Sequence, residues 1–138
     1  MATDIKTIAD LTPANLANFY GTDGYAKFMS LVLTDGAKFV AECGCHWLLT
    51  AIWSHQNKTL QKKADGLQVW KLKQLKGDPK FMAVLVCEDG NYNKLVEQKI
   101  EFTDFPFDRF GGEFSLWVEE GSLDGETTVQ VCLLPSEH

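Results

Sequence analysis

A chain of 138 residues that is 45% apolar, 12% aromatic and 23% charged is long enough to fold as one α+β domain over residues 1–138. This composition excludes extended disorder, and no apolar run approaches the length of a membrane span. The opening residues, MATDIKTIADLTP, lack the basic and then apolar order of a signal peptide. We therefore expect a soluble, cytoplasmic protein without a membrane partner.

The net charge of −6 is unevenly distributed along the chain. Residues 58–80 hold seven lysines against two aspartates, whereas residues 88–138 hold twelve acidic side chains against two lysines and one arginine. Arg109 is the only arginine of the sequence, so the bidentate contacts that DNA-binding proteins make to guanine and phosphate are scarce. Duplex nucleic acid is therefore not favoured as a partner, whereas a protein of complementary charge is favoured.

The N-terminal part is expected to form a short helix followed by a β-hairpin. Thr12 before Pro13 is a typical helix start. Residues 25–33 and 37–42 have the composition of strands, and Thr34-Asp35-Gly36 between them has that of a tight turn. The sequence therefore predicts a hairpin over residues 25–42.

Beyond Gly44 the spacing of apolar residues becomes helical, which predicts one central amphipathic helix from Cys45 to the stop at Asp65-Gly66. Strand-like runs separated by turn residues follow. They are residues 67–75, 81–87, 94–102, 114–118 and 127–134. The predicted fold is α+β, with the central helix packed on a largely antiparallel β-sheet meander.

Short segments spread over nearly the whole chain carry a resemblance to a known family. They are Phe19-Tyr20-Gly21-Thr22, Thr34-Asp35-Gly36 with Lys38 and Ala41-Glu42, Trp47-Leu48-Leu49 with Ala51-Ile52, Val69-Trp70-Lys71-Leu72, Cys87-Glu88-Asp89-Gly90, Thr103-Asp104-Phe105-Pro106 and Leu133-Leu134-Pro135-Ser136-Glu137. Together they resemble an uncharacterised family of small bacterial and phage-associated proteins. The resemblance implies a home on mobile elements and carries over no reaction, cofactor or catalytic residue.

The reactive side chains around Gly44 are two cysteines and two histidines, namely Cys43, Cys45, His46 and His55. A structural zinc site needs four ligands, and His55 lies nine residues beyond His46 along the expected helix, roughly 13 Å away. Cys43, Cys45 and His46 would therefore need Cys87 or Cys132 to complete the site. A catalytic thiol needs a base beside it, and His46 follows Cys45 directly and so points elsewhere on a helix. We expect reduced thiols and no bound metal or cofactor.

Trp117 and the acidic residues after it are the favoured partner-binding side chains. Trp117 alternates with Leu116 and Val118, which places it on the opposite face of its strand. A tryptophan with an acidic rim is typical of an interface anchor. The acidic residues are Glu119, Glu120, Asp124 and Glu126. A separate basic surface is expected at Lys62, Lys63, Lys71 and Lys73.

These features favour a non-enzymatic, protein-binding accessory factor of a phage or mobile element, with no catalytic residue. A counter-defence inhibitor similar to anti-CRISPR proteins, acting through its acidic surface, is a special case of this class. One alternative is a metal- or thiol-dependent protein centred on Cys43, Cys45, His46 and His55. The other is a small-nucleotide binder using the basic segment Lys58–Lys80, although Gly111-Gly112 lacks the lysine and helix of a phosphate-binding loop.

Overall fold

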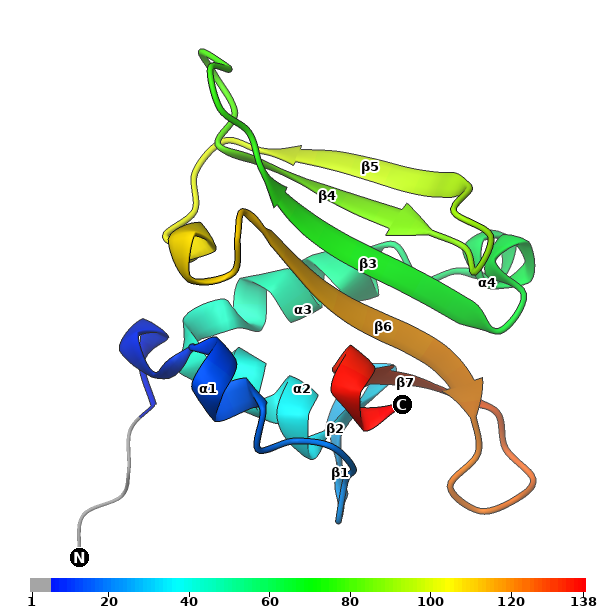
Figure 1. The fold of residues 1–138 in the computed structure, drawn as a ribbon. Coiled ribbons are helices and arrows are strands. Elements are labelled where there is room, and N and C mark those ends of the chain that lie inside the picture. The colour runs from blue at the N-terminus through cyan, green and yellow to red at the C-terminus, as the bar shows by residue number, and fades with distance from the viewer. Residues whose placement is uncertain (1–5) are drawn as a thin grey trace, which may run out of the picture.

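A computed structural model describes residues 6–138, which form a seven-stranded sheet with helices against it (Figure 1). The strands are β1 (Tyr25–Phe28), β2 (Leu31–Thr34), β3 (Leu67–Gln74), β4 (Ala83–Glu88), β5 (Lys94–Ile100), β6 (Glu113–Gly121) and β7 (Val129–Leu133). Their order across the sheet is β1-β2-β7-β6-β3-β4-β5. Only the β2–β7 pair of these strands is parallel. The α+β class and the largely antiparallel sheet are confirmed.

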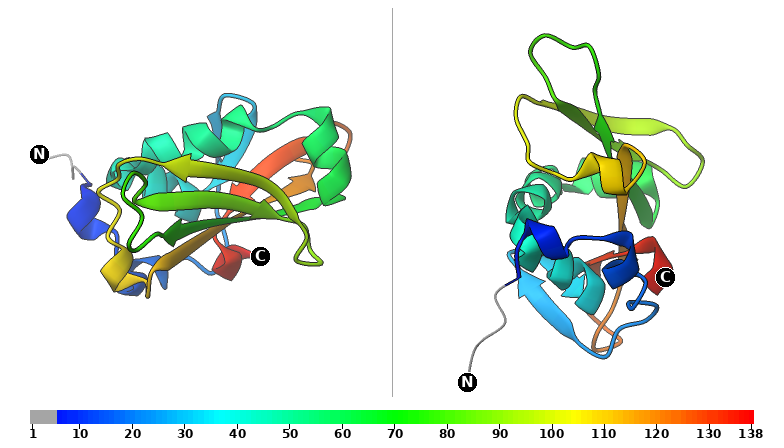
Figure 2. Two further views of the ribbon diagram at one scale, coloured as in Figure 1. Left: turned by 90° about the horizontal axis from the view of Figure 1, so that it is seen from above. Right: turned by 60° about the vertical axis from the view of Figure 1, so that its left-hand side comes forward.

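The central helix of 20 residues is built from three consecutive segments and runs along the sheet (Figures 1 and 2). The helical segments of the protein are η1 (Ile8–Asp10), α1 (Pro13–Leu16), α2 (Asp35–Val40), η2 (Ala41–Cys45), α3 (His46–Ser54), α4 (Lys58–Ala64), η3 (Phe107–Arg109) and η4 (Pro135–Glu137). Gly44 in η2 has a φ of +99°, which kinks the central helix between α2 and α3. Within residues 6–138, none of the helices combines the length and the apolar character that crossing a membrane requires.

The predicted strand at residues 37–42 is wrong, because this segment is the first half of the central helix. The hydroxyl of Thr34 accepts a hydrogen bond from the backbone N–H of Ala37 (3.3 Å), so the predicted turn is a helix cap. Ala37 and Val40, three residues apart, are both fully buried, as on one side of a helix. The hairpin lies earlier in the chain, where Met29 with a φ of +55° turns β1 into β2.

The predicted central helix also extends too far, and the meander is interrupted. The helix ends at Ser54, and α4 begins after Asn57, whose side-chain oxygen accepts a hydrogen bond from the N–H of Leu60 (2.8 Å). Because Asn57 is a favourable cap, a second helix starts where the sequence pattern suggests continuation. After β5 the chain crosses back, and β6 pairs with β3 instead of with its predecessor.

The two faces of the sheet have different environments. The inner face, toward α3, is filled by alternate residues of the central strands, namely Trp70, Leu72, Leu85, Cys87, Leu116 and Val118. Trp70 is 1% exposed, and its ring lies 5.7 Å from that of His55 at the end of α3. The outer face carries the residues between them, including Val69, Lys71 and Trp117. Sequence alternation therefore predicts the side of Trp117 correctly.

Candidate functional site

A groove of about 450 Å³ lies on the outer face and is lined by residues of β3, β4, β6, the β4–β5 loop and η4. Val69 of β3 pairs with Trp117 of β6 on one side and with Glu88 of β4 on the other. Since neighbouring strands are about 4.8 Å apart, the backbone positions of Trp117 and Glu88 lie about 10 Å apart, with Val69 between them. The groove therefore has an apolar floor, with an indole on one side and a carboxylate on the other.

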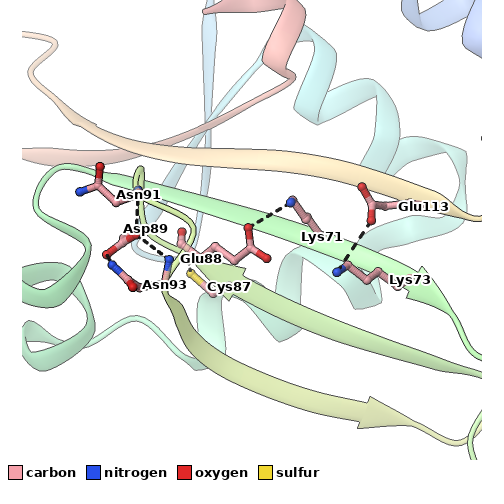
Figure 3. Close-up of polar contacts among 8 residues, drawn as sticks. All are labelled: Lys71, Lys73, Cys87, Glu88, Asp89, Asn91, Asn93 and Glu113. Carbon is pink, nitrogen blue, oxygen red and sulfur yellow. Dashed lines mark hydrogen bonds and ion pairs between the residues drawn. The ribbon is translucent and has the colours of Figure 1, made fainter.

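An ion pair lies within the groove. The Nζ of Lys71 is 3.0 Å from the Oε1 of Glu88, and the two side chains point toward each other from neighbouring strands (Figure 3). They are 22% and 14% exposed, so water screens this pair less than the Lys73–Glu113 pair further along the face. The hydrogen bond to Glu88 raises the pKa of Lys71, because it favours the charged form of the lysine.

The loop after β4 is held by the carboxylate of Asp89. It accepts hydrogen bonds from the backbone N–H groups of Asn91 (2.8 Å) and Asn93 (2.9 Å) and from the side-chain amide of Asn93 (3.0 Å) (Figure 3). These bonds, chiefly that from the Asn93 amide, lower the pKa of Asp89. Within this loop Tyr92 has a φ of +67° and is 83% exposed. The loop therefore presents an aromatic side chain at the side of the groove opposite Trp117.

Trp117 is partly covered by His138. The ring centroids are 5.2 Å apart with an interplanar angle of 69°, an edge-to-face arrangement. The Nε2 of the same imidazole lies 3.0 Å from the Oε2 of Glu119, two residues beyond Trp117 on the same face of β6. Trp117, Glu119 and His138 thus form a contiguous cluster at the rim of the groove.

The position of His138 depends on a contact between η4 and the start of the central helix. The carboxylate of Glu137 accepts hydrogen bonds from the Thr34 hydroxyl (2.6 Å), the Gly36 N–H (3.0 Å) and the Leu134 N–H (2.9 Å). A Cβ at Gly36 would lie 2.6 Å from the Cδ1 of Leu134 and closer still to Glu137, so only glycine permits this approach. We call the Glu137 contacts with Thr34 and Gly36 the latch.

The other predicted acidic residues lie away from Trp117 and Glu119. Glu120 points to the opposite side of β6, where it lines a shallow depression with Lys62 of α4. Asp124 and Glu126 are in the β6–β7 loop, where Asp124 accepts hydrogen bonds from the hydroxyl of Ser122 and the N–H groups of Glu126 and Thr127. These bonds, chiefly that from Thr127, lower the pKa of Asp124, whose carboxylate therefore caps its own turn.

The predicted basic surface is likewise divided between two places. Lys62 and Lys63 lie in the last turn of α4, where positive charge favours the helix terminus. Lys71 and Lys73 are on the outer face, and each lies beside a carboxylate. A continuous basic patch over all four lysines is therefore not formed.

The cysteines are core residues. Cys43, Cys45, Cys87 and Cys132 are all free and 0% exposed. Burial raises the pKa of Cys43 to about 11 and those of the other three thiols to about 12. Because the thiolate is the nucleophile and the metal-binding form, these side chains are unreactive near neutral pH.

The histidines do not converge with the thiols. His46 is exposed and its ring lies 6.4 Å from that of Phe28, whereas the Nε2 of His55 is 2.7 Å from the side-chain oxygen of Gln98. In the part of the chain from residue 6 onward, no group of three or more His, Cys, Asp or Glu side chains is placed to hold a metal ion. The four residues of the alternative metal or thiol site around Gly44 are therefore not brought together in the described structure.

Sequence reasoning missed Glu88, Asp89 and Tyr92, which line the groove, and His138, whose ring contacts Trp117. A signal for Glu88 was present, because its segment and that of Lys71 are adjacent strand-like runs with opposite charges on the solvent side. Nothing in the sequence indicated His138, since its contact with Trp117 requires η4 to fold back over β6. The groove is thus a product of tertiary structure.

Residues 10–138 match a family of unknown function (DUF6876). The chain belongs to this family. The expectation of an uncharacterised family is confirmed. Neither the curated proteins nor the solved structures provide a match to this chain.

Proposed function

We propose that this protein is a non-enzymatic accessory factor that binds a partner protein through the groove on its outer face. The observation that supports the proposal is the position of Trp117, a large aromatic side chain beside an apolar floor and next to carboxylates. Interfaces draw most of their binding energy from a few such anchors, with tryptophan prominent among them. A ring of charged residues around the anchor adds specificity and speeds association.

The groove is built on the central part of the sheet. β3 pairs with both β4 and β6, so the strands that carry Val69, Glu88 and Trp117 are bonded to one another along their length. A binding site on paired strands loses little conformational entropy when a partner is bound. Rigid presentation of Trp117 is what a recognition surface requires.

The partner that we propose is a host protein in the cytoplasm. The resemblance to phage-associated proteins motivates this choice, and the acidic residues Glu119, Glu120, Asp124 and Glu126 around the β6–β7 end of the molecule favour a basic target. Counter-defence is a special case, because an acidic surface can occupy a site that normally binds nucleic acid. The electrostatic field of the acidic residues speeds the encounter with a basic partner, and the groove provides the binding contacts.

Affinity capture from host lysate at low salt tests the proposal. Wild-type protein is compared with Trp117→Ala and with the matched control Tyr25→Ala, an aromatic side chain that is 53% exposed on the edge strand β1. We expect wild type and Tyr25→Ala to recover the same partner and Trp117→Ala to recover at least about 10-fold less, the effect of losing an interface anchor. Equal recovery by all three proteins would reject the groove as the binding site.

Charge reversal tests the role of the acidic residues separately. In one variant Glu119, Glu120, Asp124 and Glu126 are all replaced by lysine. We expect slower association and weaker capture, with the largest loss at low ionic strength, where screening is least. If no partner is recovered by wild type and nothing changes on reversal, the protein-binding proposal is refuted.

The two alternative functions are tested on the same preparation. Zinc and iron at stoichiometric amounts in protein purified without chelator would favour the metal protein over the binding protein. A rise in melting temperature with nucleotides would favour the nucleotide binder, because a ligand that binds the native state stabilises it by mass action. Around Lys62, the carboxylates of Asp65 and Glu120 lie in the same depression and oppose phosphate binding.

A further inference from the structure

We infer that the groove takes an arginine side chain of the partner between Trp117 and Glu119, and that His138 occupies this position in the free protein. The inference rests on the proposed function, because it names the chemistry of the group that the groove recognises. It is carried by the contacts of His138 and by the charges around the indole.

His138 occupies the position that we infer for the ligand. Its imidazole contacts the indole of Trp117 and at the same time places Nε2 3.0 Å from the Glu119 carboxylate. One planar, nitrogen-containing group therefore already satisfies both the aromatic ring and the acid. A guanidinium has the same planarity, carries a permanent positive charge and offers more N–H donors.

The charges in and beside the groove favour a cation. Glu88 and Asp89 line it, and Glu119 lies at the rim beside Trp117, whereas Lys71 is the cationic side chain within the lining. Lys71 is hydrogen-bonded to Glu88, so these two charges offset each other. Glu119 and Asp89 leave the region negative, which disfavours an acidic peptide.

Arginine fits this arrangement better than lysine. Its guanidinium stacks on an indole through cation–π attraction while its edge donates hydrogen bonds to a carboxylate. The floor of Leu67 and Val69 suits the apolar stem of the same side chain. Lysine would give up the planar stacking and the forked hydrogen bonds, because its ammonium is a point charge.

An NMR titration of the indole N–H signals tests the inference. Protein labelled with nitrogen-15 is titrated with N-acetyl-arginine amide at constant ionic strength, and N-acetyl-citrulline amide is the neutral control of the same shape. The Trp117 signal is assigned from its loss in Trp117→Phe. We expect arginine to shift this signal at least about 3-fold more than citrulline at equal concentration, because charge strengthens both proposed contacts.

Two variants sharpen the test. His138→Ala removes the competing side chain, so the arginine derivative should bind about 2-fold more tightly or better. Glu119→Gln should reduce the arginine-specific shift to the level of citrulline, and an unchanged pattern of backbone amide signals shows that this variant is folded. Equal shifts with arginine and citrulline, or an arginine response unaffected in both variants, would overturn the inference.

The failure of this inference is distinguishable from that of the proposed function. If partner capture depends on Trp117 while arginine leaves its indole signal unchanged, the groove binds a protein through another group. If capture is also independent of Trp117, both the groove as the binding site and the arginine inference are rejected.

Discussion

Both faces of the sheet carry a tryptophan and polar side chains, but these are buried and hydrogen-bonded to one another on the inner face and partly exposed on the outer face. On the inner face, the side-chain amides of Gln56 and Gln68 bond each other (2.7 and 2.9 Å), and the indole of Trp70 donates to Gln68 (2.8 Å). On the outer face, Trp117 borders a groove, and the imidazole beside it contacts only Trp117 and the partly exposed Glu119 among the ring and ion-pair contacts described above. Polar groups that are paired in the core specify the fold, whereas accessible ones remain open to binding.

Trp70 and Trp117 lie on neighbouring strands but on opposite faces of the sheet, so their substitution tests the difference between the two faces. Trp70→Ala should lower the free energy of unfolding by about 3–5 kcal/mol, because it empties a buried volume. Trp117→Ala should lower it by only about 1 kcal/mol, since its indole is partly exposed. Urea denaturation followed by circular dichroism measures both. Equal losses would show that Trp117 is a core residue and would remove the reason for treating it as an anchor.

The latch is expected to have the next largest effect. Glu137→Gln replaces one carboxylate oxygen by an NH2 group, which cannot accept a hydrogen bond. The variant therefore cannot accept from both Thr34 and Gly36, and we expect its free energy of unfolding to fall by about 1–3 kcal/mol. Glu119→Gln changes a more exposed carboxylate and should cost about 0.5 kcal/mol or less. Urea midpoints compare the two variants. A loss of stability for Glu119→Gln as large as that for Glu137→Gln would contradict the view that Glu137 stabilises the fold whereas Glu119 is available for binding.

The buried thiols predict how stability changes at high pH. The folded-state pKa of Cys132 is raised to about 12 from an ordinary value of 9.0. Above pH 9 the unfolded chain loses this proton while the folded chain keeps it, so the free energy of unfolding falls as pH rises toward 12. Cys132→Ala removes this contribution, and its loss of stability between pH 9 and pH 10 should be smaller than that of wild type by about 1 kcal/mol.

Urea denaturation at the two pH values measures this difference, and thiol labelling gives a second readout. A colorimetric thiol reagent at pH 8 should label the native protein far more slowly than the protein in denaturant. Rapid labelling of Cys43 or Cys45 in the native state would refute the buried environment and revive the thiol-dependent alternative.

The smallest expected effect is in the β6–β7 loop. Asp124→Asn weakens a carboxylate that accepts hydrogen bonds within its own turn, and we expect a loss of about 0.5 kcal/mol, measured as a small shift of the urea midpoint. Partner capture should be nearly unchanged, because this carboxylate is occupied by the loop. A loss of capture equal to that of Trp117→Ala would move the binding surface from the groove to the loop.

The sequence predicted those parts of the fold that depend on local patterns. Strand alternation placed Trp117 on the correct face, and the helix cap at Thr12 is present, with its hydroxyl accepting from the N–H of Asn15 (3.2 Å). The segment Thr34-Asp35-Gly36 was misread because its residues suit both a turn and a helix start. Contacts from η4 and from the later strands decide between these outcomes.

The candidate site was only partly predictable, because its residues come from segments far apart in the sequence. Alternation identified Trp117, and Lys71 was expected on a basic surface, but the position of the Glu88 carboxylate beside Lys71 depends on the pairing of β3 with β4. The return of β6 to the middle of the sheet brings Trp117 beside Val69. Long-range strand order of this kind leaves no periodic signal in a single sequence.

We propose that the outer face of the sheet, and not the thiol-containing interior, is the functional surface. Mapping backbone amide NMR shifts on addition of the captured partner tests it most directly. We expect the largest shift changes within residues 67–71, 88–92 and 115–119, together with His138, and little change in β1 and α4. Changes concentrated on β1 or α4, with residues 115–119 unaffected, would contradict it.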